Sequence, residues 1–266
     1  MIKIVFTDVD GTLLDGIRGF PYLSAKNQYA IKALLEKGIY VVISSGRSKS
    51  ILNKEIVSLN PNGYILCNGA YIELNNKPIQ KIVLSKEDVK YIKDLTLTNN
   101  GILFYENQEG AYADIKSKCS LLEDFITKWN MPSLKIQYKE NFDGEVYKVA
   151  NVFPTTSDFD KFTSSIDNRI DIRRQKGLLA YDIVPKEMSK GNAIKQVLDT
   201  LHISNLEALA FGDNVNDIEM LEAVGTGIAM GNACEELKKV ADDVTDDAIN
   251  DGFYKYLVSH QIIEEE

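Results

Sequence analysis

The strongest constraint on the fold is an alternation of strand and helix signals at the start of the chain. Short apolar runs, rich in β-branched residues, lie at residues 2–6, 39–44 and 64–67. Helix-like segments between them begin at Ser24 and span roughly 48–58. Nearly all-apolar runs of this kind are typical of strands covered on both faces, and strands that alternate with helices form parallel sheets. This part of the chain predicts a doubly wound α/β arrangement.

The same rhythm returns in the last third of the chain. The patterns predict helices at residues 190–201, 217–224 and 235–240, with strands between them at 208–211 and 227–229. Both ends of the chain therefore belong to one sheet that is interrupted in sequence.

The middle of the chain has a different texture. Amphipathic helix patterns alternate there with short strand-like runs, the helices at 86–97, 121–129 and 159–166 and the strands at 102–105, 111–115, 145–152, 170–173 and 179–184. Strand pairs joined by short loops indicate antiparallel hairpins. We predict a Rossmann-like α/β core formed by residues 1–83 and 186–266, with an inserted α+β cap domain at 84–185.

Charge and cysteine content limit the partners and the location that we expect. The 39 acidic and 30 basic residues give a net charge of −9, which disfavours nucleic acid and anionic membranes as partners. The three cysteines form neither a metal-binding pair nor a disulfide framework. No run has the length and apolar character of a signal peptide or a membrane span. We expect a cytoplasmic protein, with a monomer as the default state.

The most informative motif is the DVDGT run at residues 8–12, directly after the first predicted strand. Asp8 and Asp10 are two positions apart, so both carboxylates can face one pocket if the chain bends between them. The alternative is a solvated acidic turn.

Two weaker motifs follow other strands: SSGR at 44–47 combines a hydroxyl with backbone N–H groups, and GDNVND at 212–217 is rich in acids and amides. Each of these alone also fits a simple helix cap.

The positions of the three motifs favour a common site. Ligands of open parallel sheets lie outside the carboxyl ends of the strands, and Asp8, Ser45 and Asp213 each follow such an end. Asp10 and Asp217 bring the number of nearby carboxylates to as many as four. Two carboxylates about 5 Å apart repel by roughly 3 kcal/mol at an effective dielectric constant of 20. Such a cluster needs a cation, and oxygen ligands favour Mg²⁺, which in turn favours a phosphoryl substrate.

These residues resemble the haloacid dehalogenase superfamily of phosphohydrolases, and specifically its Cof-like branch with an inserted type IIB cap. DVDGT resembles the nucleophile motif, Ser45 the hydroxyl of the second motif, Lys190 in SKG the phosphate-binding lysine, and residues 212–217 the acidic metal motif. Asn68-Gly69-Ala70 also resembles that branch. Ser45 stands where many members have Thr, and Asn214 where many have Gly.

The resemblance implies roles for the acidic residues. Asp8 would attack phosphorus and form an aspartyl-phosphate, while Asp10 would protonate the leaving alcohol and then activate water. Mg²⁺ would be held by the Asp8 carboxylate, the Asp10 carbonyl and Asp213, and Asp217 would orient a metal-bound water. The phosphate group would be bound by Ser45, Gly46, Lys190 and Asn216.

The expected activity is that of an Mg²⁺-dependent phosphatase for small phosphate monoesters such as sugar phosphates. Arg173 and Asp182, near the end of the cap, are either substrate contacts or solvated charges. Two alternatives to the phosphatase are a phosphomutase, because related capped proteins share the DxD pair, and a non-catalytic sensor of a phosphorylated metabolite. The complete set of motif residues argues against the sensor.

Overall fold

The computed structural model describes residues 1–113, 136–139, 142–175, 178–186 and 188–266. The chain forms two compact units. The first comprises Met1–Ser45, Asn53–Gln80 and Ser189–Glu266, and the second comprises Gly46–Leu52 and Lys81–Met188. The chain passes between the units three residues from each predicted domain limit, and also around Gly46–Leu52, which the predicted limits placed in the core. The division into a catalytic core and a cap stays a prediction. Across the described ranges, no helix combines the length and hydropathy needed to cross a bilayer.

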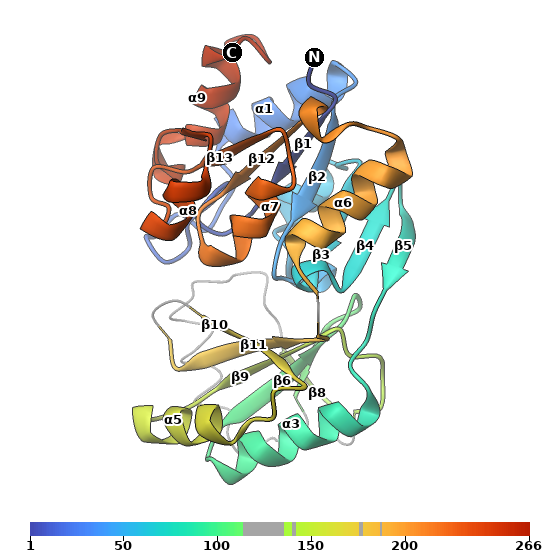
Figure 1. Cartoon of the computed structure of the whole chain (residues 1–266), viewed down its shortest axis with the longest axis vertical. Helices are drawn as coiled ribbons and strands as arrows, with labels where there is room; N and C mark the ends of the chain where they lie inside the picture. Colours follow the sequence, from blue (N-terminus) through green and yellow to red (C-terminus); the bar gives the residue numbers. More distant parts are fainter. Residues whose placement is uncertain (114–135, 140–141, 176–177, 187) are drawn as a thin grey trace. The chain divides into compact units, whose positions relative to one another are not determined.

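The first unit is built on an eight-stranded sheet (Figure 1). Its strands are β1 (Ile4–Thr7), β2 (Tyr40–Ser44), β3 (Gly63–Leu66), β4 (Tyr71–Leu74), β5 (Lys77–Lys81), β12 (Ala208–Gly212), β13 (Thr226–Ala229) and β14 (Asp243–Val244). Their order is β14-β13-β12-β1-β2-β3-β4-β5. Neighbours from β14 to β3 are parallel, whereas β4 is antiparallel to β3. The parallel sheet is confirmed, and the strands beyond β3 are an addition that the sequence patterns did not predict.

Helices cover both faces of this sheet (Figure 1). They are α1 (Ala25–Glu36), α2 (Lys54–Ser58), α6 (Lys190–Leu201), α7 (Ile218–Glu222), α8 (Glu235–Val240) and α9 (Gly252–Ser259). On one face, Phe6 packs in an apolar cluster with Ile194 of α6 and Met220 of α7. On the other, the rings of Phe211 and Phe253 of α9 meet edge to face with centroids 4.9 Å apart. The doubly wound prediction is confirmed, although α9 was not predicted.

The strand order places a switch point next to β1. The chain proceeds from β1 to β2 and β3 on one side, and from β12 to β13 and β14 on the other. Thr7 at the end of β1 is in register with Phe211 of β12. Crossovers that leave in opposite directions open a crevice at the carboxyl ends of the two central strands. Asp8 and Asp213 directly follow these two strands.

The second unit contains a six-stranded sheet of mixed direction with α3 (Lys86–Thr98) and α5 (Thr156–Ser165). Its strands are β6 (Ile102–Glu106), β7 (Ala111–Ala113), β8 (Ile136–Tyr138), β9 (Lys148–Val152), β10 (Asp171–Arg174) and β11 (Ala180–Val184). Their order in the sheet is β10-β11-β9-β6-β7-β8. The hairpin pairs β6–β7 and β10–β11 are antiparallel, as predicted, whereas β7–β8 is parallel. The predicted helix at 121–129 lies outside the described residues.

The helix predicted over residues 48–58 is wrong. That segment forms a 3₁₀ turn at Lys49–Ile51 and the short helix α2, and Leu52 and Asn53 between them are extended. The Asn53 side chain is almost fully buried and donates a hydrogen bond to the Pro21 carbonyl at 2.7 Å. This contact with a distant loop holds Asn53 at the N-cap of α2, where an extended backbone is required.

The packing of α1 yields a stability prediction. Leu34 of α1 is fully buried, whereas Leu206 is 76% exposed. The same Leu→Ala substitution at the two positions therefore differs only in how much buried apolar surface it removes. We expect Leu34→Ala to lower the free energy of unfolding by about 2–5 kcal/mol, and Leu206→Ala to change it by less than about 0.5 kcal/mol. Urea denaturation measures both. Equal effects of the two substitutions would contradict the described packing.

Candidate active site

The DVDGT turn begins where β1 ends. The Asp8 amide donates to the carbonyl of Phe211 in β12 at 2.9 Å, which continues the sheet pairing by one residue. The chain then bends, because the amides of Leu13 and Leu14 both donate to the Val9 carbonyl, at 3.0 and 3.1 Å. Val9 is fully buried and Asp8 nearly so, at 6% exposed. The turn therefore fixes Asp8 at the edge of the sheet rather than in solvent.

Gly11 brings the first and last motifs together. Its φ of +87° is a conformation that glycine adopts without strain. A Cβ atom at this position would lie 2.2 Å from Oδ2 of Asp213. Any other side chain at position 11 would therefore displace the Asp213 carboxylate. The glycine of DVDGT is explained by two requirements, backbone conformation and the close approach of Asp213.

Lys190 joins two of the carboxylates. It is the first residue of α6, whose N-cap Ser189 accepts a hydrogen bond from the Asn192 amide at 3.1 Å. The Lys190 ammonium group donates to Oδ1 of Asp8 at 2.5 Å and to Oδ1 of Asp217 at 2.6 Å. Its side chain is fully buried. The structure thus places Lys190 beside Asp8 and Asp217, and its assignment to phosphate binding stays a prediction.

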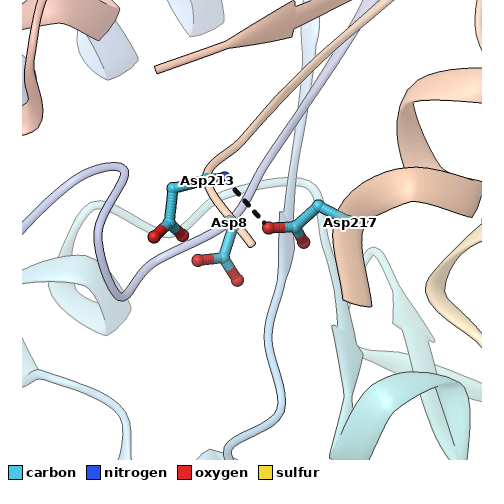
Figure 2. A group of neighbouring side chains, drawn as sticks. All are labelled: Asp8, Asp213 and Asp217. Atoms are coloured by element: carbon cyan, nitrogen blue, oxygen red, sulfur yellow. Dashed lines mark hydrogen bonds between the residues drawn. The ribbon is translucent and has the colours of Figure 1, made fainter. Parts of the chain in front are cut away.

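Asp217 organises the loop after β12. Its Oδ2 accepts hydrogen bonds from the backbone amides of Asp213 and Asn214, at 3.0 and 3.1 Å (Figure 2 draws the first). Its Oδ1 accepts from Lys190. Asp217 is fully buried, and both of its oxygens are engaged by N–H donors. This arrangement suits a residue that holds the loop and the lysine in place.

Three carboxylates of the site are placed where they could hold a divalent cation. Asp8, Asp213 and Asp217 each offer an oxygen, and these three atoms lie within 4.8 Å of one another (Figure 2). Oδ1 of Asp213 is buried and has no hydrogen-bond partner among the described residues. An all-carboxylate set with such an oxygen fits a hard cation such as Mg²⁺. Because the Asp217 oxygens are already engaged, Asp8 and Asp213 are the best-placed carboxylate ligands.

The electrostatics also favour a cation. Burial raises the pKa of Asp8 to about 7, with the Lys190 charge opposing this shift and the charges of Asp217 and Asp10 adding to it. Burial and the neighbouring Asp8 raise the pKa of Asp213 well above its usual range. Burial lowers the pKa of Lys190, but Asp217 and Asp8 outweigh this effect and raise it. One ammonium group does not compensate three buried carboxylates.

Ser45 and Asn216 are connected through Asn68. The Ser45 amide donates to the Ile65 carbonyl at 2.8 Å, and the Ser45 carbonyl accepts from the Asn68 amide at 3.2 Å. Nδ2 of Asn216 donates to Oδ1 of Asn68, also at 3.2 Å. Gly46, the next residue after Ser45, belongs to the second compact unit. The assignment of Ser45, Gly46 and Asn216 to phosphate binding stays a prediction.

The sequence patterns did not single out Asn232, which contacts the DVDGT turn. Its Nδ2 donates to the Gly11 carbonyl at 2.7 Å, and its Oδ1 accepts from the Ala248 amide at 2.9 Å. Asn232 lies three residues beyond β13. Ligands of open parallel sheets lie at the carboxyl ends of the strands, and β13 is one of these strands, so the same rule could have identified Asn232 from the sequence.

Arg173 and Asp182, the predicted cap contacts, lie opposite one another in the β10–β11 ladder. Arg173 donates to Oδ2 of Asp171 at 3.0 Å. Oδ1 of Asp182 accepts from Nε2 of Gln175 at 2.7 Å and lies 3.2 Å from the Lys148 ammonium. Both side chains remain partly exposed, at 22% and 18%. Their role in substrate contact stays a prediction.

With this geometry established, comparison with known proteins defines the class. Residues 5–257 match the sequence model of the haloacid dehalogenase-like hydrolase family. The chain belongs to this family, and the resemblance inferred from the motifs is confirmed.

Individual relatives are similar along nearly the whole chain. YkrA of Bacillus subtilis (strain 168) is 29% identical over 253 residues, covering 94% of each chain. The 5-amino-6-(5-phospho-D-ribitylamino)uracil phosphatase YcsE of the same organism is 28% identical over 266 residues, covering 96% of this chain and 94% of the relative. A solved subclass IIB sugar phosphatase, BT4131, has 27% identity and a TM-score of 0.82, covering 98% of this chain and all of that one. These similarities confirm the predicted class, an enzyme of a phosphatase family.

The raised carboxyl pKa values predict how the stability of the metal-free protein depends on pH. Between pH 3.8 and about 7, native Asp8 retains a proton that the unfolded chain has released, so the free energy of unfolding falls as pH rises. We expect the melting temperature in EDTA to fall across this range, with a smaller fall in Asp213→Asn, which removes a second buried carboxyl group whose pKa is raised. Scanning calorimetry measures the slopes.

The control for this prediction is Asp94→Asn, which changes a carboxylate that is 57% exposed on α3. Its slope should equal that of the wild type. Identical slopes in the wild type and Asp213→Asn would contradict the electrostatic description of the site.

Proposed function

We propose that this protein is an Mg²⁺-dependent phosphatase that hydrolyses small phosphate monoesters through an aspartyl-phosphate on Asp8. The observation that carries the proposal is the meeting of Asp8, Asp213, Asp217 and Lys190 at the carboxyl ends of two adjacent parallel strands. A carboxylate there has a cationic partner and lies at the crevice where ligands of such sheets bind.

The proposed reaction has two displacements. In the first, an Asp8 carboxylate oxygen bonds to phosphorus as the ester P–O bond breaks, and the Asp10 carboxyl gives its proton to the leaving alkoxide. In the second, the Asp10 carboxylate takes a proton from water as the water oxygen bonds to phosphorus. The bond between phosphorus and Asp8 breaks, which releases inorganic phosphate and restores the Asp8 carboxylate.

The other proposed residues prepare and stabilise these steps. The Lys190 charge opposes the rise in the pKa of Asp8 and so favours the ionised nucleophile. Ser45, Gly46 and Asn216 bind the phosphoryl oxygens, and the N-terminus of α6 adds a favourable dipole. Asp8, Asp213 and the Asp10 carbonyl would hold Mg²⁺, which would supply positive charge toward the phosphoryl oxygens.

We propose sugar phosphates or related metabolites as the substrate class. Two relatives support this class by their names: one is a sugar phosphatase, and the other a phosphatase of a phosphoribitylamino uracil. We also propose that the inserted domain, residues 84–185, selects the substrate and that Arg173 and Asp182 contribute contacts. The partly exposed charge of each side chain is suited to the hydroxyl groups of a polar leaving group.

Removal of the nucleophile tests the chemistry. We expect Asp8→Asn to lower phosphate release from a chromogenic aryl phosphate by about 10³-fold or more, because the amide oxygen is a poor nucleophile. Asp94→Asn on the surface should leave the rate unchanged. Phosphate release and isomer formation are both measured with a panel of phosphorylated sugars. Formation of an isomer without phosphate would replace the phosphatase with a phosphomutase, and hydrolysis that survives in Asp8→Asn would overturn the assigned nucleophile.

Metal removal tests the cofactor. We expect EDTA to abolish turnover and added Mg²⁺ to restore it, and we expect Asp213→Asn to raise the Mg²⁺ concentration needed for half-maximal activity by about tenfold or more. A magnesium titration of the steady-state rate measures this shift. Full activity in the presence of chelator would refute the metal assignment.

A further inference from the structure

A short turn after β3 has an unusual backbone. Cys67, Asn68 and Gly69 have φ values of +51°, +55° and +103° in succession. Positive φ is unfavourable for residues other than glycine, although asparagine tolerates it better than most. All three residues are buried, with Asn68 only 2% exposed. Unfavourable conformations of this kind persist when surrounding contacts over-determine them, and they often occur at functional sites.

Asn68 makes specific contacts with two segments of the candidate site. Its backbone amide donates to the Ser45 carbonyl at the end of β2, at 3.2 Å. Its side-chain Oδ1 accepts from Nδ2 of Asn216 in the loop after β12, also at 3.2 Å. Asn216 is only partly buried, whereas Asn68 lies beneath the surface. Asn68 therefore supports both residues without being exposed itself.

The next residue brings a third segment close. A Cβ atom on Gly69 would lie 2.6 Å from the carbonyl oxygen of Ser189, the residue before Lys190. The turn therefore passes directly against the N-cap of α6. Within three consecutive residues, it contacts the segments that carry Ser45, Asn216 and Lys190.

The contact with Asn216 fixes the orientation of its amide group. An asparagine side chain has two N–H donors on one end and a carbonyl acceptor on the other. In the structure the Asn68 side chain presents Oδ1, which can only accept, so this arrangement selects the orientation in which the Asn216 nitrogen faces it. The second N–H of the same nitrogen then stays available for an anionic oxygen. The flipped amide would lose this hydrogen bond and expose its carbonyl, which repels a phosphate.

We propose that Asn68 is a positioning residue for phosphate binding, which holds the Asn216 amide with its N–H toward the substrate and fixes the Ser45 segment through the backbone. This inference rests on the proposed phosphatase function. The left-handed backbone at Asn68 is maintained because it lets one residue reach both partners. Function and stability should then respond in opposite directions when this residue is changed.

Asn68→Gly is the informative variant. Glycine adopts this backbone conformation readily and keeps the amide that contacts Ser45, but it lacks Oδ1. We expect an unchanged or higher melting temperature, and increases of about tenfold in both KM and the inhibition constant of inorganic phosphate, with a smaller change in kcat. Simple damage to the fold would instead lower the active fraction and kcat, and leave KM and phosphate inhibition unchanged.

Asn76→Gly provides a matched control. Asn76 also has a positive φ, +62°, but it is exposed in the turn between β4 and β5. The same substitution there relieves the same kind of backbone conformation, and we expect KM and phosphate inhibition equal to those of the wild type.

A double-mutant cycle with Asn216→Ala completes the test. If Asn68 acts through Asn216, the double variant should bind phosphate no more weakly than Asn216→Ala alone. Phosphate inhibition of Asn68→Gly within twofold of the wild type, additive effects in the cycle, or a lower melting temperature would each overturn the inference. The wild type in the same assays tests the proposed function separately: without ester hydrolysis and phosphate inhibition there, the phosphatase proposal itself fails.

Discussion

The buried ammonium group of Lys190 is the interaction on which the candidate site depends. It lies between carboxylates of Asp8 and Asp217, which are far from each other in the sequence. A buried lysine is tolerated when such partners replace its hydration, so the pair of hydrogen bonds fixes the start of α6 against the end of β1. With Asp213 included, the buried carboxylates still outnumber the cation. The same arrangement that orders the polypeptide therefore leaves a negative excess suited to a divalent metal.

Sheet topology and two glycines make this concentration of charge possible. β1 and β12 are adjacent, so Asp8 and Asp213 emerge side by side from the ends of the two strands. Gly11 lies directly against Asp213, and a Cβ atom on Gly212 would lie 2.6 Å from Cβ of Asp217. At both places a side chain would separate the carboxylates. The glycines in the two acidic motifs thus have a packing role that accounts for their position.

The sequence patterns correctly predicted those elements whose structure is determined by residues close to one another in the chain. Asp8 and Asp213 follow mostly apolar strands, and the rule for strand ends requires no knowledge of distant contacts. The extended Asn53, by contrast, is held by the carbonyl of Pro21, and α9 is held by ring contacts with Phe211. Such features arise from residues far apart in the chain, so periodicity alone does not reveal them. Asn232 is an intermediate case, since its strand was predicted but its contact was not.

Stability and function draw on different regions of the first unit. The two faces of the sheet are closed by apolar clusters, such as that of Phe6, Ile194 and Met220, which provide the burial that stabilises the fold. The carboxyl edge instead contains an Asp213 oxygen without a hydrogen-bond partner in the described part of the chain, and left-handed residues at Cys67 and Asn68, all of which reduce stability. A fold can keep such features when its apolar layers provide surplus stability. Their concentration at one edge is therefore what we expect where the structure is arranged for a ligand.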